Sequence, residues 1–255
     1  MTDYFNKLDM LPTLADVGRG KIPKAIPFGG YGEKVAVAGS SGVVWPDGVF
    51  TYPPTAGIQM SVVSTSASDG VGGVGARSID IHYLDANLVE KTTTVVLNGT
   101  TPVLTTPTDI RFIQCMHMVT FGTTKSAVGT ITAYVGANIY SQISIGSIRC
   151  SSSVRMVPTG MRLFVTSMFA GAVSGTATAK VLIKIATPSF DGHDFTQDSL
   201  FMPLFSAAYQ DSSSGLTIPC PLPFTEGQSV GMTYTTDKDA TIVASWFGWL
   251  EPLEG

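Results

Sequence analysis

The sequence predicts an all-β protein with two tandem antiparallel β-sandwich modules of jelly-roll-like design, preceded by an extended N-terminal arm. The composition is the first reason: 27 Gly and 15 Pro in 255 residues favour turns and strands over long helices. The second reason is that apolar residues alternate with polar ones in many short runs, with no 3.6-residue helical period. The third is a pattern of turn, strand, small-residue loop and strand that occurs once in each half of the chain.

The repeated pattern occupies residues 53–85 and 157–186. In the first copy a Pro-Thr-Ala-Gly turn precedes an alternating strand, and a Gly/Ser/Asp loop then leads to a second strand that begins at Ala76. In the second copy a Pro-Thr-Gly turn precedes the first strand, and the second strand begins at Ala177. The copies match by pattern rather than by identity. They predict two modules of like design, at residues 35–150 and 151–255.

Charge is scarce in this chain. Charged residues make up 13% of the sequence, about half the usual share. A surface with so few charges suits a subunit whose faces are covered by copies of itself or by other proteins. The net charge of −4 argues against a general nucleic-acid binder, which needs a basic face.

The three cysteines, Cys115, Cys150 and Cys220, are widely spaced and odd in number. This spacing predicts neither a disulfide framework nor a CxxC metal site, and buried free thiols are the expectation. The N-terminus lacks the basic and apolar regions of a signal peptide, and no apolar run approaches the roughly 18 residues of a membrane span. We therefore expect synthesis in a cytoplasm and no membrane insertion.

Residues 1–34 do not resemble a domain. From Gly18 onward this segment is rich in glycine and proline. Pro23 and Pro27 hold the chain extended, and such a segment cannot bury enough surface alone to offset the entropy of ordering. It nevertheless carries basic and large apolar side chains, which favour an arm that docks on a neighbouring subunit; an unstructured tail is the alternative. The candidate docking residues are Arg19, Lys21, Ile22, Lys24, Ile26, Phe28 and Tyr31.

Several local patterns make specific predictions about strand connections. Asn98-Gly99 predicts a type I′ hairpin, because that turn wants positive φ at both central residues. Residues 110–119 and 129–137 are expected to form a second hairpin. The stretch 240–250 is apolar on both faces, which predicts an interior or interface strand.

No catalytic or metal-binding constellation is found. His82, His117 and His193 do not occur in metal-binding spacings, and no nucleophile elbow or phosphate-binding loop is present. Asp191 and Asp194 flank His193 in a loop that could hold a hydrolytic site, although a polar surface turn is the simpler interpretation. The sequence therefore predicts no enzyme, no cofactor and no metal. Trp45, beside a Pro-Asp-Gly turn, is the candidate ligand contact if the chain binds a glycan.

The order of several motifs resembles virion structural proteins of tailed bacteriophages, of the kind labelled receptor-binding tail or head-fibre and decoration proteins. The motifs are VWPDGVFTYPP at 44–54, GARSIDIHYLDANL at 75–88, LNGTTPV at 97–103, MVPTGMRLFVTSM at 156–168, the GTATAKVLIKI strand, and the closing stretch at 221–250. Together they span most of the chain, and the N-terminal arm is outside them.

The resemblance implies a non-enzymatic structural protein that assembles as a symmetric oligomer, trimeric or higher, in a virion built in the host bacterial cytoplasm. The leading hypothesis is a tail-associated adaptor, a fibre anchor or a receptor-binding accessory. A capsid decoration protein is the alternative within this class, and a carbohydrate-binding module is the alternative outside it. The expected partners are copies of the chain, a tail adaptor, portal-proximal or capsid protein, and a host surface receptor.

Overall fold

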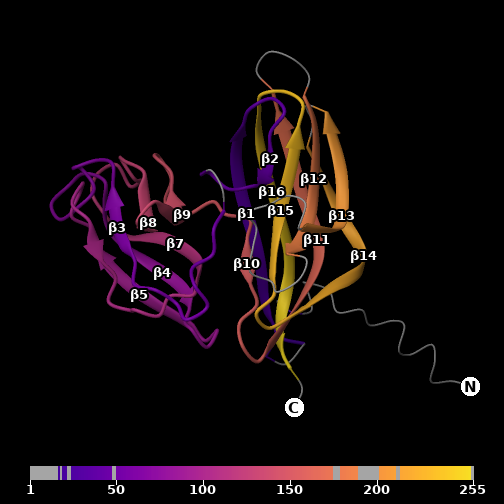
Figure 1. Cartoon of the computed structure of the whole chain (residues 1–255), viewed down its shortest axis with the longest axis horizontal. Helices are drawn as coiled ribbons and strands as arrows, with labels where there is room; N and C mark the ends of the chain where they lie inside the picture. The colour runs from indigo at the N-terminus through magenta and orange to yellow at the C-terminus, as the bar shows by residue number, and fades with distance from the viewer. Residues whose placement is uncertain are drawn as a thin grey trace, which may run out of the picture.

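The computed structural model describes residues 17, 19–21, 24–47, 50–174, 179–188, 201–210 and 213–253, and this part of the chain is essentially all-β (Figure 1). No helix among these residues has the length and apolar character needed to span a membrane. The strands are β1 (Ile26–Ala36), β2 (Ser41–Val43), β3 (Ser61–Ser64), β4 (Ala76–Leu84), β5 (Glu90–Val96), β6 (Val103–Leu104), β7 (Phe112–Phe121), β8 (Ile131–Val135), β9 (Asn138–Ile143), β10 (Arg155–Met156), β11 (Met161–Val173), β12 (Lys180–Pro188), β13 (Phe201–Gln210), β14 (Ser213–Thr225), β15 (Ser229–Thr236) and β16 (Ala240–Pro252).

The strands form two units that lie side by side in Figure 1. The larger unit has one sheet in the order β1-β16-β11-β14 and a second in the order β10-β15-β12-β13, where β2 also pairs with β15. A single apolar core contains residues of both sheets, among them Leu163, Ile183, Met232 and Trp246. The smaller unit consists of the sheets β6-β3-β8-β9 and β5-β4-β7 around a core of its own.

The two units share one strand order. In the smaller unit β3 lies between β6 and β8, and β4 lies between β5 and β7. In the larger unit β11 lies between β14 and β16, and β12 lies between β13 and β15. Each strand from β3 to β8 therefore has its counterpart from β11 to β16, and all of these neighbouring strands pair antiparallel. The repeated sequence pattern corresponds to the first two strands of each set.

The arrangement along the chain differs from a simple tandem of an arm and two modules. β1 pairs with β16 along its whole length and β2 pairs with β15, so both strands belong to the larger unit. The smaller unit is thus inserted between β2 and β10. Residues 26–34, expected in the docking arm, form most of β1.

Both predicted hairpins are wrong, because the connections concerned cross from one sheet to the other. β7 pairs with β4, whereas β8 pairs with β3 and β9. Asn98-Gly99 does form a turn, with Gly99 at φ 57°, but it joins β5 to β6, which lie in different sheets. The interior position of the last strand is confirmed, since β16 pairs with β1 on one side and β11 on the other.

The inserted unit leaves and rejoins the larger one through two segments that are held together at Ser153. The Ser153 amide donates to the Val44 carbonyl at 3.2 Å, which joins the outgoing and returning segments. The Trp246 indole N–H donates to the Ser153 carbonyl at 2.8 Å. The Met232 amide donates to Ser153 Oγ at 3.1 Å, and the hydroxyl lies 3.3 Å from the Met232 carbonyl. Ser153 is fully buried, so these bonds satisfy groups that water cannot reach.

Two glycines of β1 permit this crossing. A Cβ at Gly30 would lie 2.3 Å from the Ser153 carbonyl oxygen, and one at Gly32 would lie 2.1 Å from the Val44 carbonyl oxygen. Both distances are far inside van der Waals contact. Only glycine lets the connecting segments pass so close to the strand.

A third apolar cluster joins the two units. It contains Leu84 and Phe112 from the inserted unit with Val43, Trp45 and Met156 from the larger one. The side-chain amide of Gln114, on β7, donates to the Met156 carbonyl at 2.5 Å and accepts from the Met156 amide at 3.2 Å. The Gln114 side chain thus pairs with Met156 as the backbone of a neighbouring strand would. As a result β10 is held against the inserted unit as well as against β15.

The loop 66–75 of the inserted unit is organised by a buried carboxylate. Asp69 is fully buried and accepts hydrogen bonds from Ser64 Oγ at 2.6 Å and from the amides of Ala76, Val128 and Gly129 at 2.8, 3.0 and 2.7 Å. These four donors compensate the loss of hydration of a carboxylate that has no cationic partner among the described residues. The loop is therefore fixed from within.

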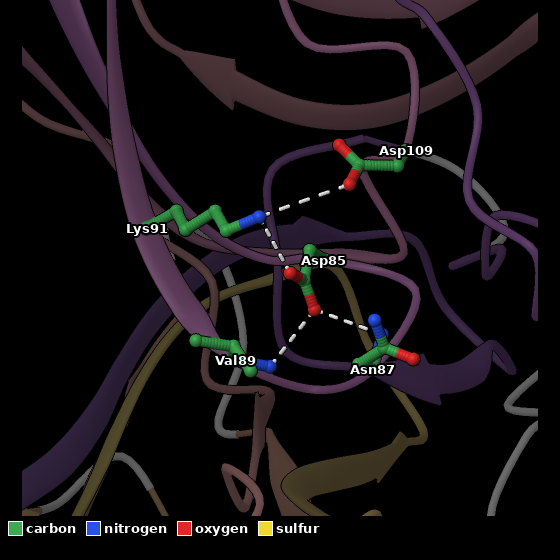
Figure 2. A network of polar contacts seen from close by, with 5 residues as sticks. All are labelled: Asp85, Asn87, Val89, Lys91 and Asp109. Carbon is green, nitrogen blue, oxygen red and sulfur yellow. Dashed lines mark hydrogen bonds and ion pairs between the residues drawn. The ribbon is translucent and has the colours of Figure 1, made fainter.

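The β4–β5 turn is held by a second buried carboxylate, Asp85, shown in Figure 2. It accepts from the amides of Asn87 and Val89 at 2.8 and 3.0 Å, and Lys91 Nζ lies 2.7 Å from it. Burial by itself would raise the pKa of Asp85, but the hydrogen bonds from Lys91, Val89 and Asn87 lower it below its ordinary value. The turn also accepts a bond from the larger unit, since the Thr159 amide donates to the Leu88 carbonyl at 2.9 Å.

We predict that Gly30→Ala lowers the free energy of unfolding by about 1–3 kcal/mol, because the new methyl group overpacks the Ser153 crossing. Chemical denaturation followed by tryptophan fluorescence measures this change. The control is Glu33→Ala on the same strand, which is exposed and should stay within about 0.5 kcal/mol of wild type. Equal stability of the two variants would contradict the role given to Gly30.

We predict that Asp85→Asn lowers the free energy of unfolding at pH 7 by about 1–3 kcal/mol, because it weakens the bond to Lys91 and leaves turn amides poorly paired. The folded-state pKa is lowered, so the carboxylate stabilises the fold above its ordinary pKa and loses this effect as pH falls through the folded value. Denaturation at several pH values should show the gap between wild type and variant closing in acid. Asp109→Asn is the control, since the Asp109 side chain is 41% exposed and lies 3.9 Å from Lys91; a pH-independent gap would contradict the assignment.

Candidate functional site

A cavity of about 410 Å³ lies along the part of β1 that carries its two consecutive glycines. β1 is the last strand of its sheet, with β16 on one side only. The cavity is lined by this strand, by β16 and by the segment that returns from the inserted unit, through Pro27, Phe28, Gly29, Gly30, Tyr31, Arg149, Arg155, Phe247 and Gly248. Its walls are thus apolar and aromatic with two guanidinium groups.

Arg155 is the unusual member of this lining because it is only 5% exposed. Its Nη1 donates to the carbonyls of Ser152 and Val154 at 2.9 and 2.7 Å. Within the described residues no carboxylate lies within ion-pair distance of Arg155 or of Arg149. A guanidinium that is buried without a counter-ion costs several kcal/mol unless an anion approaches it.

Arg149 is exposed and connects this cavity to a second one. The second cavity, of about 390 Å³, is lined by His82, Cys115, His117, Met118, Ile148 and Arg149. Arg149 Nη2 lies 3.9 Å from Cys115 Sγ, and Cys115 Sγ lies 3.3 Å from Cys150 Sγ. Two arginines and two thiols are therefore gathered where the inserted unit rejoins the larger one.

The two thiols titrate as a pair. The Met116 amide donates to Cys150 Sγ at 3.3 Å, which makes Cys150 the better place for a negative charge. The hydrogen bond from Cys115 lowers the pKa of Cys150 to about 5 against the effect of burial, with help from Arg155 and the Met116 amide. The same hydrogen bond, followed by burial, raises the pKa of Cys115. Cys115 therefore keeps its proton while Cys150 carries the charge.

The histidine rings of the second cavity stack on one another. His82 and His117 lie with their centroids 5.0 Å apart and an interplanar angle of 15°, and His82 Nδ1 is 3.0 Å from Thr92 Oγ1. They line one cavity with Cys115, yet among the described residues no group of three or more His, Cys, Asp or Glu is arranged to hold a metal ion. Asp191, His193 and Asp194 lie outside the described residues.

The predicted docking residues do not form one arm. Ile26, Phe28 and Tyr31 lie in β1, paired with β16 of the same chain, and the Phe28 ring packs 6.0 Å from the Trp246 indole. Ile26 and Tyr31 remain 46% and 45% exposed. Arg19, Lys21 and Lys24 are exposed, and Ile22 lies outside the described residues.

Trp45, the predicted ligand contact, lies in the interior. Its indole is 1% exposed and packs edge-on against Phe50 at 5.2 Å, within the apolar cluster that joins the two units. A sugar in solvent cannot stack on this ring, so its burial argues against the ligand-contact prediction. The tryptophan stabilises the junction instead.

Sequence reasoning did not identify Arg155 or the thiol pair. One signal was present: Arg149 and Arg155 are the only charged residues between Lys125 and Arg162, in a stretch that passes from one unit to the other. Their closeness to β1 depends on the insertion, which the linear pattern does not reveal.

The larger unit also exposes apolar side chains on the side of the sheet β1-β16-β11-β14 that faces away from the second sheet; we call this side the outer face. Tyr31 and Phe169 occupy one row of paired residues, with Ser245 between them, and Val35 and Val173 occupy another, with Thr241 between them. The exposed fractions are 74% for Val35, 68% for Val173, 48% for Phe247, 45% for Tyr31 and 43% for Phe169. In the outward positions of 29–35, 167–173 and 241–247 the one charged residue is Glu33.

Comparisons with known proteins do not assign this chain to a family. No family model and no curated protein matches it. Among solved structures, the mosquito-larvicidal Cry4Aa toxin of Bacillus thuringiensis is 8% identical with a TM-score of 0.20, and the match covers 71% of this chain and 43% of the toxin. A chain from the structure of the infectious bursal disease virus Gx strain is 9% identical to this chain, with a TM-score of 0.20. A chain from the VP2 subviral particle of infectious bursal disease virus is 10% identical, with a TM-score of 0.19. Each match covers 89% of this chain and 72% of the other chain. Likenesses this remote carry no argument about function.

We predict that the folded protein contains a thiolate at neutral pH that is lost on acidification with a midpoint near 5, the pKa of Cys150. The ultraviolet absorbance of the thiolate, followed against pH, measures it. Cys115→Ala removes the hydrogen-bond donor and should move the midpoint upward toward ordinary thiol values. Cys220→Ala is the matched control and should leave it unchanged; a wild-type midpoint at ordinary thiol values would contradict the paired arrangement.

Proposed function

We propose that this chain is a non-enzymatic structural subunit of a virion that assembles with copies of itself through the outer face. The observation that carries the proposal is the exposed apolar surface made by Tyr31, Val35, Phe169, Val173 and Phe247. Such a surface is costly in a free monomer and favourable when a second surface covers it. Glu33 is the one charge among the outward positions of 29–35, 167–173 and 241–247, so this part of the outer face suits an uncharged surface such as another copy of itself.

The strand order supports the same proposal. Four-stranded sheets in the orders β1-β16-β11-β14 and β2-β15-β12-β13, with successive strands alternating between them except at the β12–β13 pair, fit the jelly-roll class predicted from the sequence. Jelly rolls recur in viral capsid domains and in lectins, so the fold is compatible with a virion role and does not require one. The resemblance to tailed-phage proteins favours a tail-associated adaptor, fibre anchor or receptor-binding accessory within this proposal, with capsid decoration as the alternative.

We predict that the wild-type chain sediments as a trimer or a higher oligomer and that Phe169→Ser with Phe247→Ser shifts it toward monomer. Each phenylalanine contributes about 1.5–3 kcal/mol when buried. Since about 1.4 kcal/mol is tenfold in an equilibrium constant, the dissociation constant should rise at least about tenfold. Sedimentation velocity over a range of concentrations measures the effect.

The control is Val96→Ser with Leu104→Ser, which changes apolar residues that are 54% and 63% exposed on the inserted unit. This variant should associate as the wild type does, and unfolding curves should show that both variants fold. A wild-type chain that stays monomeric at every concentration would overturn the proposal, and a closed dimer would contradict the expected symmetry.

A further inference from the structure

We propose that the cavity along β1 binds a small organic carboxylate, an anion carried on an apolar or aromatic body. This site does not require the proposed assembly, because its lining comes from one chain. It rests on the buried Arg155, on the second guanidinium at Arg149, and on the aromatic lining of the same cavity.

The bonding of Arg155 identifies the chemistry of the anion. Nη1 is occupied by the carbonyls of Ser152 and Val154, and no acceptor among the described residues pairs with Nε or Nη2. Neither nitrogen is a fully buried unpaired atom, so this edge of the guanidinium is reachable from the cavity. Nε–H and Nη2–H are parallel donors with the spacing of the two oxygens of a carboxylate, which they can bind in a bidentate manner.

The charge around the cavity also requires an anion. Arg149 and Arg155 contribute two positive charges, and the nearest acidic group that acts on both of them is the Cys115–Cys150 pair, which holds one proton in its ionised form. The Glu33 carboxylate lies on the same strand as Tyr31 and interacts electrostatically with the Tyr31 hydroxyl. Among the described residues one positive charge at the arginines therefore has no anionic partner, which favours a monoanion over a dianion.

The remaining lining selects the rest of the ligand. Phe28, Tyr31 and Phe247 contribute aromatic surface, and Pro27 with the two glycines adds an uncharged wall. A volume of about 410 Å³ lies within the range of about 300–1,000 Å³ found for small-molecule sites. An inorganic anion would fill little of this space and leave the aromatic surface in contact with water.

Isothermal titration calorimetry with 3-phenylpropionate tests the site, with 3-phenylpropanol as the neutral analogue and inorganic phosphate as the anion without an apolar body. We expect 3-phenylpropionate to bind once per chain. The alcohol should bind at least about tenfold more weakly because it loses one charge-assisted interaction, and phosphate at least about tenfold more weakly because it buries no apolar surface. Equal affinity for 3-phenylpropanol, tighter binding of phosphate, or the absence of binding by 3-phenylpropionate would each overturn the proposal.

Two variants assign the binding to the arginines. Arg149→Gln, at an exposed position, and Arg155→Lys, which keeps the charge but loses the fork of donors, should each weaken 3-phenylpropionate about tenfold. Arg162→Gln on β11 is the matched control and should bind as wild type does. Both test variants should sediment as the wild type does, so failure of this site is distinguishable from failure of the assembly proposal; unchanged affinity in Arg149→Gln would overturn the assignment.

Discussion

The close contact between Ser153 and the β1–β16 pair is the constraint on which the rest of the structure depends. At this point the chain leaves one unit and returns from the other, and two backbone segments must be buried between strands. The Trp246 indole, the Met232 backbone and Val44 satisfy the polar groups of Ser153, while Gly30 and Gly32 provide the space. Because buried backbone groups without partners cost several kcal/mol, few other residues would allow a whole unit to be inserted here.

Local chemistry in the sequence predicts the strands but not the sheets to which they belong. Alternation identified most strands of both units, and the repeated pattern at 53–85 and 157–186 corresponds to the same pair of strands in each. Turns at hairpins and at connections between sheets use the same residue types, so Asn98-Gly99 resembled a hairpin although its strands separate. β1 was interpreted as an arm because glycine and proline weaken a strand, and the reason for Gly30 and Gly32 lies over a hundred residues away at Ser153.

The candidate site could not be derived from the sequence for a related reason. Arg149 and Arg155 meet Phe28, Tyr31 and Phe247 only because the returning segment passes beside β1. Cys115 and Cys150 are brought to 3.3 Å by the pairing of residues 148–150 with β7, where the Cys150 amide donates to the Met116 carbonyl. The scarcity of charge was the one signal of this site in the sequence. Two isolated arginines in a long uncharged stretch indicate a structural or a chemical role for their charge.

The cavity and the outer face share Tyr31 and Phe247, so the two proposed roles are physically linked. A second copy packed on the outer face would cover the aromatic side of the cavity and exclude water from it. Attraction between a guanidinium and a carboxylate strengthens as the surrounding dielectric falls, so a bound anion would be held more firmly in the assembled state. Thermodynamic reciprocity then requires that the anion favour assembly by the same factor, which makes the edge of β1 the place where ligand and neighbour would communicate.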